Sequence, residues 1–196
     1  MLFGSSGIRK LFAQELLSLG PLVGAAVASN AKRVVLATDS RTSRNTLSDV
    51  ILSGLISGGA EVLFGGIAPT PSVALAAGKA DAGVMITASH NPENYNGYKL
   101  FRPDGSSYTV AQQEEIERRI AEPVYAAWDK QGIVSSVDII TPHKEKILAE
   151  ISVPESMTVV VDCGNGAGGQ ITPDVIGADG AKVIPVNCDP SGKFAR

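Results

Sequence analysis

The residues best suited to chemistry lie between Thr87 and Leu100, a stretch that reads T-A-S-H-N-P-E-N-Y-N-G-Y-K-L. Ser89 offers a hydroxyl nucleophile, His90 an imidazole that can transfer protons, and Lys99 an ammonium group. The apolar run A-G-V-M-I-T before Ser89 predicts a buried strand. Ser89 is then expected just past the carboxyl end of that strand, where open α/β sheets place ligands. This loop is therefore the first candidate for an active site.

Three chemistries compete for the loop around Ser89. An ordinary turn would explain part of it, because Ser and Asn are common turn residues and Asn91-Pro92 disfavours helix. A serine hydrolase is disfavoured, because there is no G-x-S-x-G motif and the side chains of Ser89 and His90 should point oppositely on extended backbone. The only other histidine is His143. A serine that carries a phosphoryl group fits better, because that chemistry mainly needs cations and backbone N–H groups around the phosphoryl oxygens.

Two further segments contain groups that could bind an anion. The first residues, F-G-S-S-G-I-R-K, bring Ser6, Arg9 and Lys10 together with glycines, a composition suited to a phosphate-binding loop. A solvated chain terminus would look similar. A-T-D-S-R-T-S-R-N places Arg41 and Arg44 at the end of another predicted strand, where basic residues are often simply solvated. Each loop alone could be an ordinary turn, a solvated terminus or a solvated strand end. Three such loops in one chain favour phosphate binding.

The elements that must position these loops alternate between strand and helix from Lys32 onward. Strands are predicted in R-V-V-L-A-T, E-V-L-F-G, A-G-V-M-I-T and Y-K-L-F. A helix from about Asn45 should end at Gly58-Gly59. Thr70 is predicted to cap a second helix with Pro71 at its first position, and Thr109 with Gln112 forms a capping box for a third helix. The alternation predicts an α/β fold with a layered, mixed, mostly parallel sheet flanked by helices.

A domain boundary is predicted near Val153, after a helix that follows Thr141-Pro142. Residues 1–153 would form the first domain, and 154–196 the start of a second α/β domain. M-T-V-V-V-D and A-K-V-I-P-V-N predict only two strands there, and two strands with one short helix do not close a core. We therefore expect the second domain to be incomplete and the chain to be a fragment.

Composition excludes several classes of protein. The 196 residues are 44% hydrophobic and 19% charged with a formal net charge of -3, which does not suggest a nucleic-acid or membrane surface. No apolar run is long enough to cross a bilayer, and no signal peptide is evident, so a soluble cytoplasmic protein is predicted. Cys163 and Cys188 could pair, but free thiols are expected in a reducing compartment.

These motifs together resemble a known family, the α-D-phosphohexomutases, which include phosphoglucomutase/phosphomannomutase and phosphoglucosamine mutase. T-A-S-H-N-P followed by Y-N-G-Y-K is similar to the family's phosphoserine loop, and F-G-S-S-G-I-R to its N-terminal F-G-T-S-G-x-R. A-T-D-S-R-T-S resembles G-x-D-x-R-x-S, and T-P-S-V and D-C-G-N-G-A-G-G also fit. Ser5, Lys10 and Ala37 depart from the residues that are usual at their positions.

The resemblance implies a mutase that moves a phosphoryl group between O1 and O6 of a hexose phosphate, through phospho-Ser89 and a hexose 1,6-bisphosphate. Mannose or glucose phosphate is favoured by the form of the loop, with glucosamine phosphate as a third choice. The site residues it implies are catalytic Ser89, His90 and Lys99 and phosphate-binding Ser6, Arg9 and Arg41. A lysine close to arginines should lose its proton more readily, as a general base must.

The resemblance also implies Mg²⁺ bound through the phosphate of Ser89. The remaining metal ligands, the sugar-recognition loop and a final phosphate-binding loop belong to later parts of the family's sequence. Catalysis is therefore expected to need C-terminal domains that this chain lacks, in a full-length protein that is a monomer or a homodimer. The partners implied are hexose phosphates, with no nucleic acid and no membrane.

Two alternatives remain at this point. Gly164-x-Gly166-x-x-Gly169 follows a predicted strand and has Asp189 about twenty residues on, which matches the dinucleotide-binding fingerprint of NAD(P)-dependent oxidoreductases. That function would leave the Ser89 loop unexplained. The other alternative is a mutase-like protein that binds sugar phosphates without turning them over.

Overall fold

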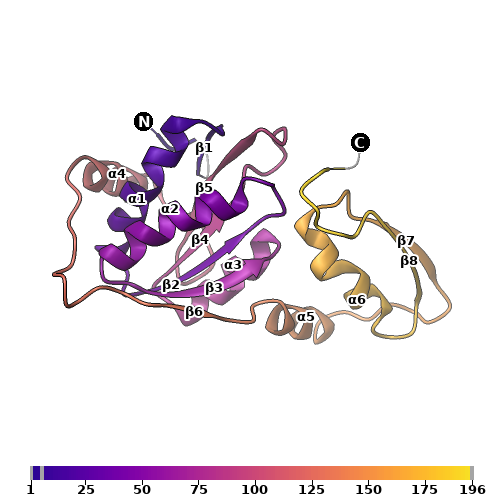
Figure 1. Ribbon diagram of the computed structural model, residues 1–196. Coiled ribbons are helices and arrows are strands. Elements are labelled where there is room, and N and C mark those ends of the chain that lie inside the picture. The colour runs from indigo at the N-terminus through magenta and orange to yellow at the C-terminus, as the bar shows by residue number, and fades with distance from the viewer. Residues whose placement is uncertain (1, 5–6, 195–196) are drawn as a thin grey trace.

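The computed structural model describes residues 2–4 and 7–194, which form a larger and a smaller β-sheet (Figure 1). The larger sheet has the strand order β1-β5-β4-β2-β3-β6. Its strands are β1 (Ile8–Leu11), β2 (Arg33–Thr38), β3 (Glu61–Ile67), β4 (Ala82–Ile86), β5 (Tyr95–Phe101) and β6 (Val134–Ser136). The helices around it are α1 (Gln14–Ala28), α2 (Arg44–Ser57), α3 (Thr70–Ala76), α4 (Val110–Ala121) and α5 (Thr141–Leu148).

The larger sheet is mixed and mostly parallel, as predicted. Strands β4, β2, β3 and β6 run parallel, while β5 pairs antiparallel with both β4 and β1. Because β4 and β5 are consecutive antiparallel strands, the connection between them is a hairpin loop. The loop that contains Ser89 is this connection, rather than a strand-to-helix turn.

Apolar side chains fill both faces of the larger sheet. One cluster joins the sheet to α1, α2 and α4, with Leu16, Ile51 and Ile116 as members from the three helices. A smaller cluster lies on the other face, where Val73 of α3 packs with Met85 and other sheet residues. The sheet is therefore held from both sides, which fixes the ends of β2 and β4 where the candidate site lies.

Helix α1 was not predicted, because Gly20, Pro21 and Gly24 interrupt its apolar pattern. These small residues allow a close approach to α2. A Cβ atom on Gly24 would lie 2.4 Å from the carbonyl oxygen of Ile51, and one on Gly54 would lie 2.0 Å from that of Pro21. Residues that usually signal a break in a helix serve here to bring two helices into contact.

The predicted helix starts are mostly confirmed. Thr109 and Gln112 form the capping box at the start of α4. The predicted N-cap of α3 was wrong by one position: Pro69 is the N-cap, Thr70 is already helical, and no side chain caps the helix. Pro71 removes one of the N–H groups that have no partner at the helix start, and the carbonyl oxygen of Pro69 accepts the N–H of Ser72 at 2.9 Å.

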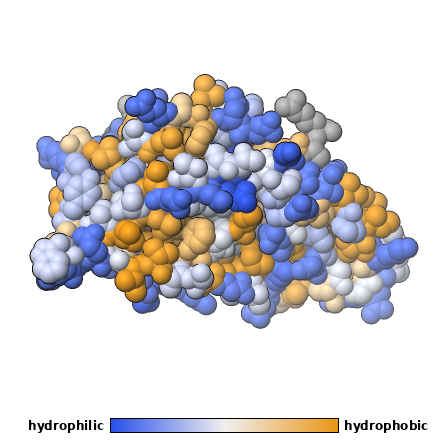
Figure 2. Space-filling view, in the orientation of Figure 1, coloured by the Kyte–Doolittle hydropathy of each residue, from blue (hydrophilic) through white to orange (hydrophobic). Residues whose placement is uncertain are grey.

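The smaller sheet pairs β7 (Thr158–Asp162) with β8 (Lys182–Val186) in parallel, next to the six-residue helix α6 (Thr172–Gly177). Val161 and Val175 are buried, whereas Val160 and Ile184 are 64% and 41% exposed. Apolar surface is visible at this end of the molecule in Figure 2. The two predicted strands are thus confirmed. The predicted boundary near Val153 falls in the stretch between α5 and β7 and stays a prediction.

The described residues contain no helix that is both long and apolar enough to span a bilayer.

The pairing of β1 with β5 depends on Gly97. A Cβ atom at this position would lie 1.9 Å from the carbonyl oxygen of Ile8. Gly97→Ala is therefore expected to lower the free energy of unfolding by about 3 kcal/mol or more, because the strands must separate to admit a methyl group. Urea denaturation would measure the loss. Gly78→Ala, whose Cβ would meet only an atom at 3.4 Å, is the matched control, and equal stability of the two variants would contradict the prediction.

Candidate active site

Ser89 lies just beyond β4 in a left-handed backbone conformation, with φ of 58°. L-residues with a side chain avoid this region at a cost of about 1–2 kcal/mol, so surrounding contacts must hold the turn. Thr87 supplies two of them: its hydroxyl donates to Asp39 Oδ2 at 2.7 Å and accepts the backbone N–H of Ser89 at 2.9 Å. The end of β2 is thereby connected directly to the candidate nucleophile.

The side chain of Arg41 binds the backbone of the loop from Ser89 to Tyr95. Its side chain is 1% exposed. All five of its N–H donors are used: Nε by Asp39 Oδ2, Nη1 by the carbonyl oxygens of Pro92 and Tyr95, and Nη2 by those of Ser89 and Asn91. The four carbonyl bonds measure between 2.6 and 3.1 Å. A single buried guanidinium therefore sets the path of the loop from Ser89 to Tyr95.

The sequence predicted that Arg41 binds a phosphate, and this stays a prediction. In this structure the loop carbonyls and Asp39 occupy all five N–H groups of its guanidinium. The geometry makes Arg41 a positioning residue for Ser89. Asp39 and Thr87 belong to the same hydrogen-bond network, and neither was predicted as a site residue. Asp39 stands in the A-T-D-S-R-T-S motif that resembles the family pattern, but no role was predicted for it.

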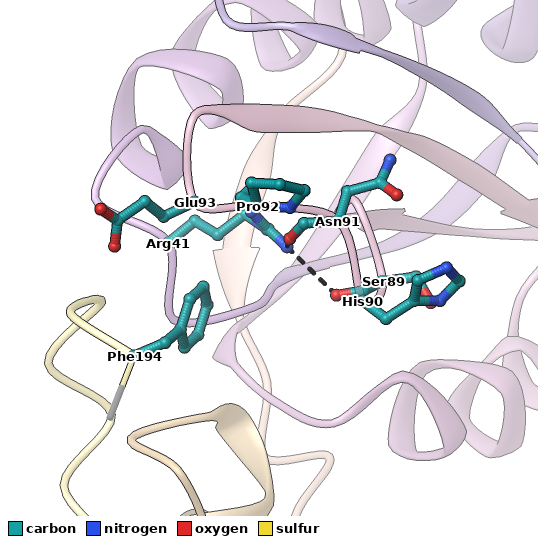
Figure 3. Close-up of a pocket in the computed structure, with 7 residues that line it drawn as sticks. All are labelled: Arg41, Ser89, His90, Asn91, Pro92, Glu93 and Phe194. Carbon is teal, nitrogen blue, oxygen red and sulfur yellow. Dashed lines mark hydrogen bonds between the residues drawn. The ribbon is translucent and has the colours of Figure 1, made fainter. Parts of the chain in front are cut away.

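A cavity of about 340 Å³ lies against the Ser89 loop (Figure 3). Its lining residues are Arg41, Ser89, His90, Asn91, Pro92, Glu93 and Phe194. Phe194 comes from the C-terminal segment, and its ring centroid lies 5.2 Å from the guanidinium carbon of Arg41, a cation–π contact. Figure 3 shows Phe194 on one side of Arg41 and His90 beyond Ser89 on the other. The sequence alone gave no signal for Phe194.

The expected separation of Ser89 and His90 was wrong. The Ser89 hydroxyl lies 3.4 Å from His90 Nδ1, a long hydrogen bond. The prediction assumed extended backbone, whereas the left-handed turn at Ser89 rotates the two side chains to the same side. A hydrolase relay still gains no support from the other histidine. His143 pairs instead with the buried hydroxyl of Ser72, at 2.8 Å, and fastens α5 to α3.

Arg9 and Lys99 form a second group on the adjacent strands β1 and β5. Arg9 lies opposite Gly97, two residues before Lys99, so both side chains share one face of the sheet. Burial lowers the pKa of Lys99, and the charge of Arg9 lowers it further. Neither residue lines the cavity beside Ser89. Gly7 packs against the backbone of Lys99, while Ser6, predicted to bind phosphate, lies outside the described residues.

The Arg9→Met variant is expected to raise the pKa of Lys99 without restoring it fully, since burial is the larger cause and remains. NMR titration of the chain with ¹³C-methylated lysines would follow this pKa. Lys10→Met removes the neighbouring cation, which pairs with Glu15, and serves as the control. A Lys99 pKa that rises equally in both variants, or in neither, would show that Arg9 has no specific effect.

The glycine motif after β7 forms a turn that contacts the part of the chain built around the larger sheet, here called the first unit. The part built around the smaller sheet is called the second unit. The carbonyl oxygen of Asn165 accepts the hydroxyl of Ser40 at 2.9 Å. A Cβ atom on Gly169 would lie 2.0 Å from the carbonyl oxygen of Cys188. The last glycine of the motif, Gly169, lies within a 3₁₀ turn over Ala167–Gln170 that precedes the short helix α6. In a dinucleotide-binding site, a helix N-terminus follows the glycines directly and faces the phosphates. This turn does not have that arrangement, and its contacts are those of a structural turn.

The described residues contain no group of three His, Cys, Asp or Glu side chains placed to hold a metal ion. The carboxylate of Asp39, which belongs to the hydrogen-bond network beneath the Ser89 loop, already accepts hydrogen bonds from Thr87 and Arg41. Residues 2–4 and 7–194 thus do not by themselves form a Mg²⁺ site.

Residues 1–126 match the family model described as phosphoglucomutase/phosphomannomutase, alpha/beta/alpha domain I. The match covers more than half of the chain, which therefore belongs to the phosphoglucomutase/phosphomannomutase family, as the sequence motifs indicated. The matched residues end before the glycine motif, so it is the geometry of the turn after β7, rather than this match, that disfavours the dinucleotide-binding alternative.

Individual relatives agree with this assignment. The phosphoglucosamine mutase of Methanococcus vannielii is 40% identical over 98% of this chain and 44% of its own length, and that of Methanococcus maripaludis strain C7 is 38% identical over 98% and 43%. The crystal structure of a phosphoglucomutase/phosphomannomutase family protein from Burkholderia thailandensis superposes with a TM-score of 0.87 at 27% identity, over 100% of this chain and 45% of that one. The chain spans less than half the length of these relatives.

Proposed function

We propose that this chain is the phosphoserine-bearing part of a hexose-phosphate mutase, and that Ser89 is the residue that is phosphorylated. One observation carries the proposal: an exposed serine is held in a strained left-handed turn, at the edge of a cavity, by contacts from two strands and a buried arginine. A serine in an ordinary turn would not need this support. Strain of this kind is found where a side chain must be presented in one orientation.

In the proposed reaction, a hydroxyl oxygen of the sugar phosphate attacks the phosphorus atom of phospho-Ser89. The bond between phosphorus and Ser89 Oγ breaks, the hydroxyl proton passes to a base, and a hexose bisphosphate forms. After the bisphosphate reorients, Ser89 Oγ attacks the phosphorus atom of its other phosphate. The bond between that phosphorus and the sugar oxygen breaks, and the sugar oxygen takes up the proton that the base received. Lys99 suits the role of base because its lowered pKa increases the fraction that is neutral, and His90 lies within reach of Ser89 Oγ.

The substrate is proposed to be a hexosamine phosphate. The form of the Y-N-G-Y-K segment favoured mannose or glucose phosphate, but the relatives at 38% and 40% identity are named phosphoglucosamine mutases. Glucosamine 6-phosphate, mannose 6-phosphate and glucose 6-phosphate should therefore be compared in that order, with the longer protein of which we propose this chain to be the N-terminal part.

Magnesium is proposed to bind through an oxygen of the Ser89 phosphate, with its other ligands supplied by residues beyond this chain. When bound, it would neutralise charge on the phosphoryl group. Hexose 1,6-bisphosphate is proposed both as the intermediate and as the compound that first phosphorylates the enzyme.

The test is to incubate the longer protein with glucosamine 1,6-bisphosphate and to locate the phosphate by mass spectrometry of proteolytic peptides. The peptide that contains Ser89 is expected to gain one phosphoryl group, and the protein then to interconvert the two monophosphates. A phosphate found only on another residue would refute the assignment of Ser89. Binding without phosphorylation or turnover would favour the sugar-phosphate-binding alternative.

A further inference from the structure

The two cysteines of the chain lie side by side in the second unit. Cys163 directly follows β7, and Cys188 comes two residues after the end of β8. The parallel pairing of these strands continues to Asp162 and Val186, so the two cysteines leave the sheet at the same end. Their sulfur atoms are 3.3 Å apart, and both side chains are free thiols and partly exposed. A small movement would bring the sulfurs to bonding distance.

We propose that Cys163 and Cys188 form a redox pair, which is oxidised to an intramolecular disulfide by a low-molecular-weight disulfide such as oxidised glutathione. One protein thiolate attacks a sulfur of the glutathione disulfide and releases one glutathione thiolate. The second protein thiolate attacks the mixed disulfide at the protein sulfur and expels the other glutathione. The protein loses two electrons and two protons, and both appear in two molecules of reduced glutathione.

The loops that follow the two cysteines both contact the segment around Arg41. After Cys163, the carbonyl oxygen of Asn165 accepts the hydroxyl of Ser40. After Cys188, a Cβ on Gly192 would lie 2.4 Å from the carbonyl oxygen of Ser40, and Phe194 stacks on Arg41. A disulfide would join the starting points of these two loops. Oxidation would thereby stabilise the contact between the second unit and the residue that positions the Ser89 loop.

The surroundings of Cys163 affect the rate of this thiol–disulfide exchange. Burial, assisted by Cys188 and Asp162, raises the pKa of Cys163 to about 11. Few Cys163 thiolates exist at neutral pH, which disfavours this sulfur as the first attacker and makes the exchange slow. A slowly formed disulfide fits a lasting change of state better than a catalytic dithiol that must cycle with each turnover.

The experiment is to equilibrate the full 196-residue chain with oxidised glutathione and to analyse it by intact-mass and peptide mass spectrometry. Both free thiols are expected to disappear, with a mass lower by two hydrogens and a peptide pair linked through Cys163 and Cys188. Stable glutathione adducts on both cysteines, or chains linked in dimers, would overturn the proposal. Cys163→Ser and Cys188→Ser are the controls, and each should retain one bound glutathione.

Thermal unfolding tests the link to the loops. The closed ring would span 25 residues of separation, and its formation is expected to raise the melting temperature by about 5 °C or more. The double variant Cys163→Ser/Cys188→Ser, treated identically, should show no change. A disulfide that forms without shifting the melting temperature would overturn the inference that it stabilises the contact with the first unit.

Discussion

The Ser89→Ala variant of the longer protein is expected to take up no phosphoryl group from the bisphosphate and to lose turnover by at least about 10⁴-fold, because no nucleophile replaces the hydroxyl. Activity would be measured by interconversion of the two hexosamine monophosphates, and phosphorylation by peptide mass spectrometry. Turnover within about tenfold of the wild type would eliminate Ser89 as the phosphoryl carrier.

Ser89→Gly separates the chemistry from the backbone strain at the same position. Glycine adopts a φ of 58° without steric cost, whereas alanine does not. Both variants should be inactive, but the glycine variant should be at least as stable as the wild type in urea denaturation. If Ser89→Gly were clearly less stable, the left-handed conformation would not be a source of strain. If only the alanine variant were inactive, its inactivity would reflect distortion of the loop.

Arg41→Lys is expected to lower the free energy of unfolding by about 3–5 kcal/mol and to reduce mutase turnover by two orders of magnitude or more. The ammonium group keeps the charge but offers three donors from one point, whereas the loop and Asp39 present five acceptors around a planar guanidinium. At least two buried acceptors would lose their partner, and the turn at Ser89 would no longer be held.

Arg44→Lys provides the matched control for this experiment. Arg44 lies three residues further on, and among the described residues it makes two long side-chain hydrogen bonds, of 3.3 Å, to the carbonyl oxygens of Ser40 and Arg41. Its replacement should change stability by no more than about 1 kcal/mol. If Arg41→Lys behaved like Arg44→Lys in unfolding and in turnover, the network beneath the loop would not be what positions Ser89.

The parts of this structure that follow from local chemistry could be predicted from the sequence. The capping box of Thr109 and Gln112, the buried run before Ser89 and the glycine stop after α2 each depend on neighbouring residues, and each was found. Helix α1 was missed because the glycines that break its pattern act on α2, thirty residues away. A residue's effect on its own segment is visible in the sequence, whereas its effect on a distant segment is not.

The candidate site divides in the same way. Ser89, His90 and Lys99 stood out by their types and their order, and the family match supports the motif as a whole. The hydrogen bonds of Arg41 could not be predicted, because its acceptors are backbone carbonyls about fifty residues away, which any sequence would provide. The closeness of Ser89 and His90 depends on one φ angle, and no residue type near it required that value.

The position of β1 in the sheet has a consequence for how the protein is assembled during synthesis. The hairpin of β4 and β5 joins residues close in sequence, but β1 pairs only with β5, and Ile8 lies opposite Tyr98. Residues 8–11 therefore have no strand to join until about the hundredth residue has left the ribosome. Pairing over such a separation is slow to form. Arg9 is thus expected to reach its place beside Lys99 only after the Ser89 hairpin has formed.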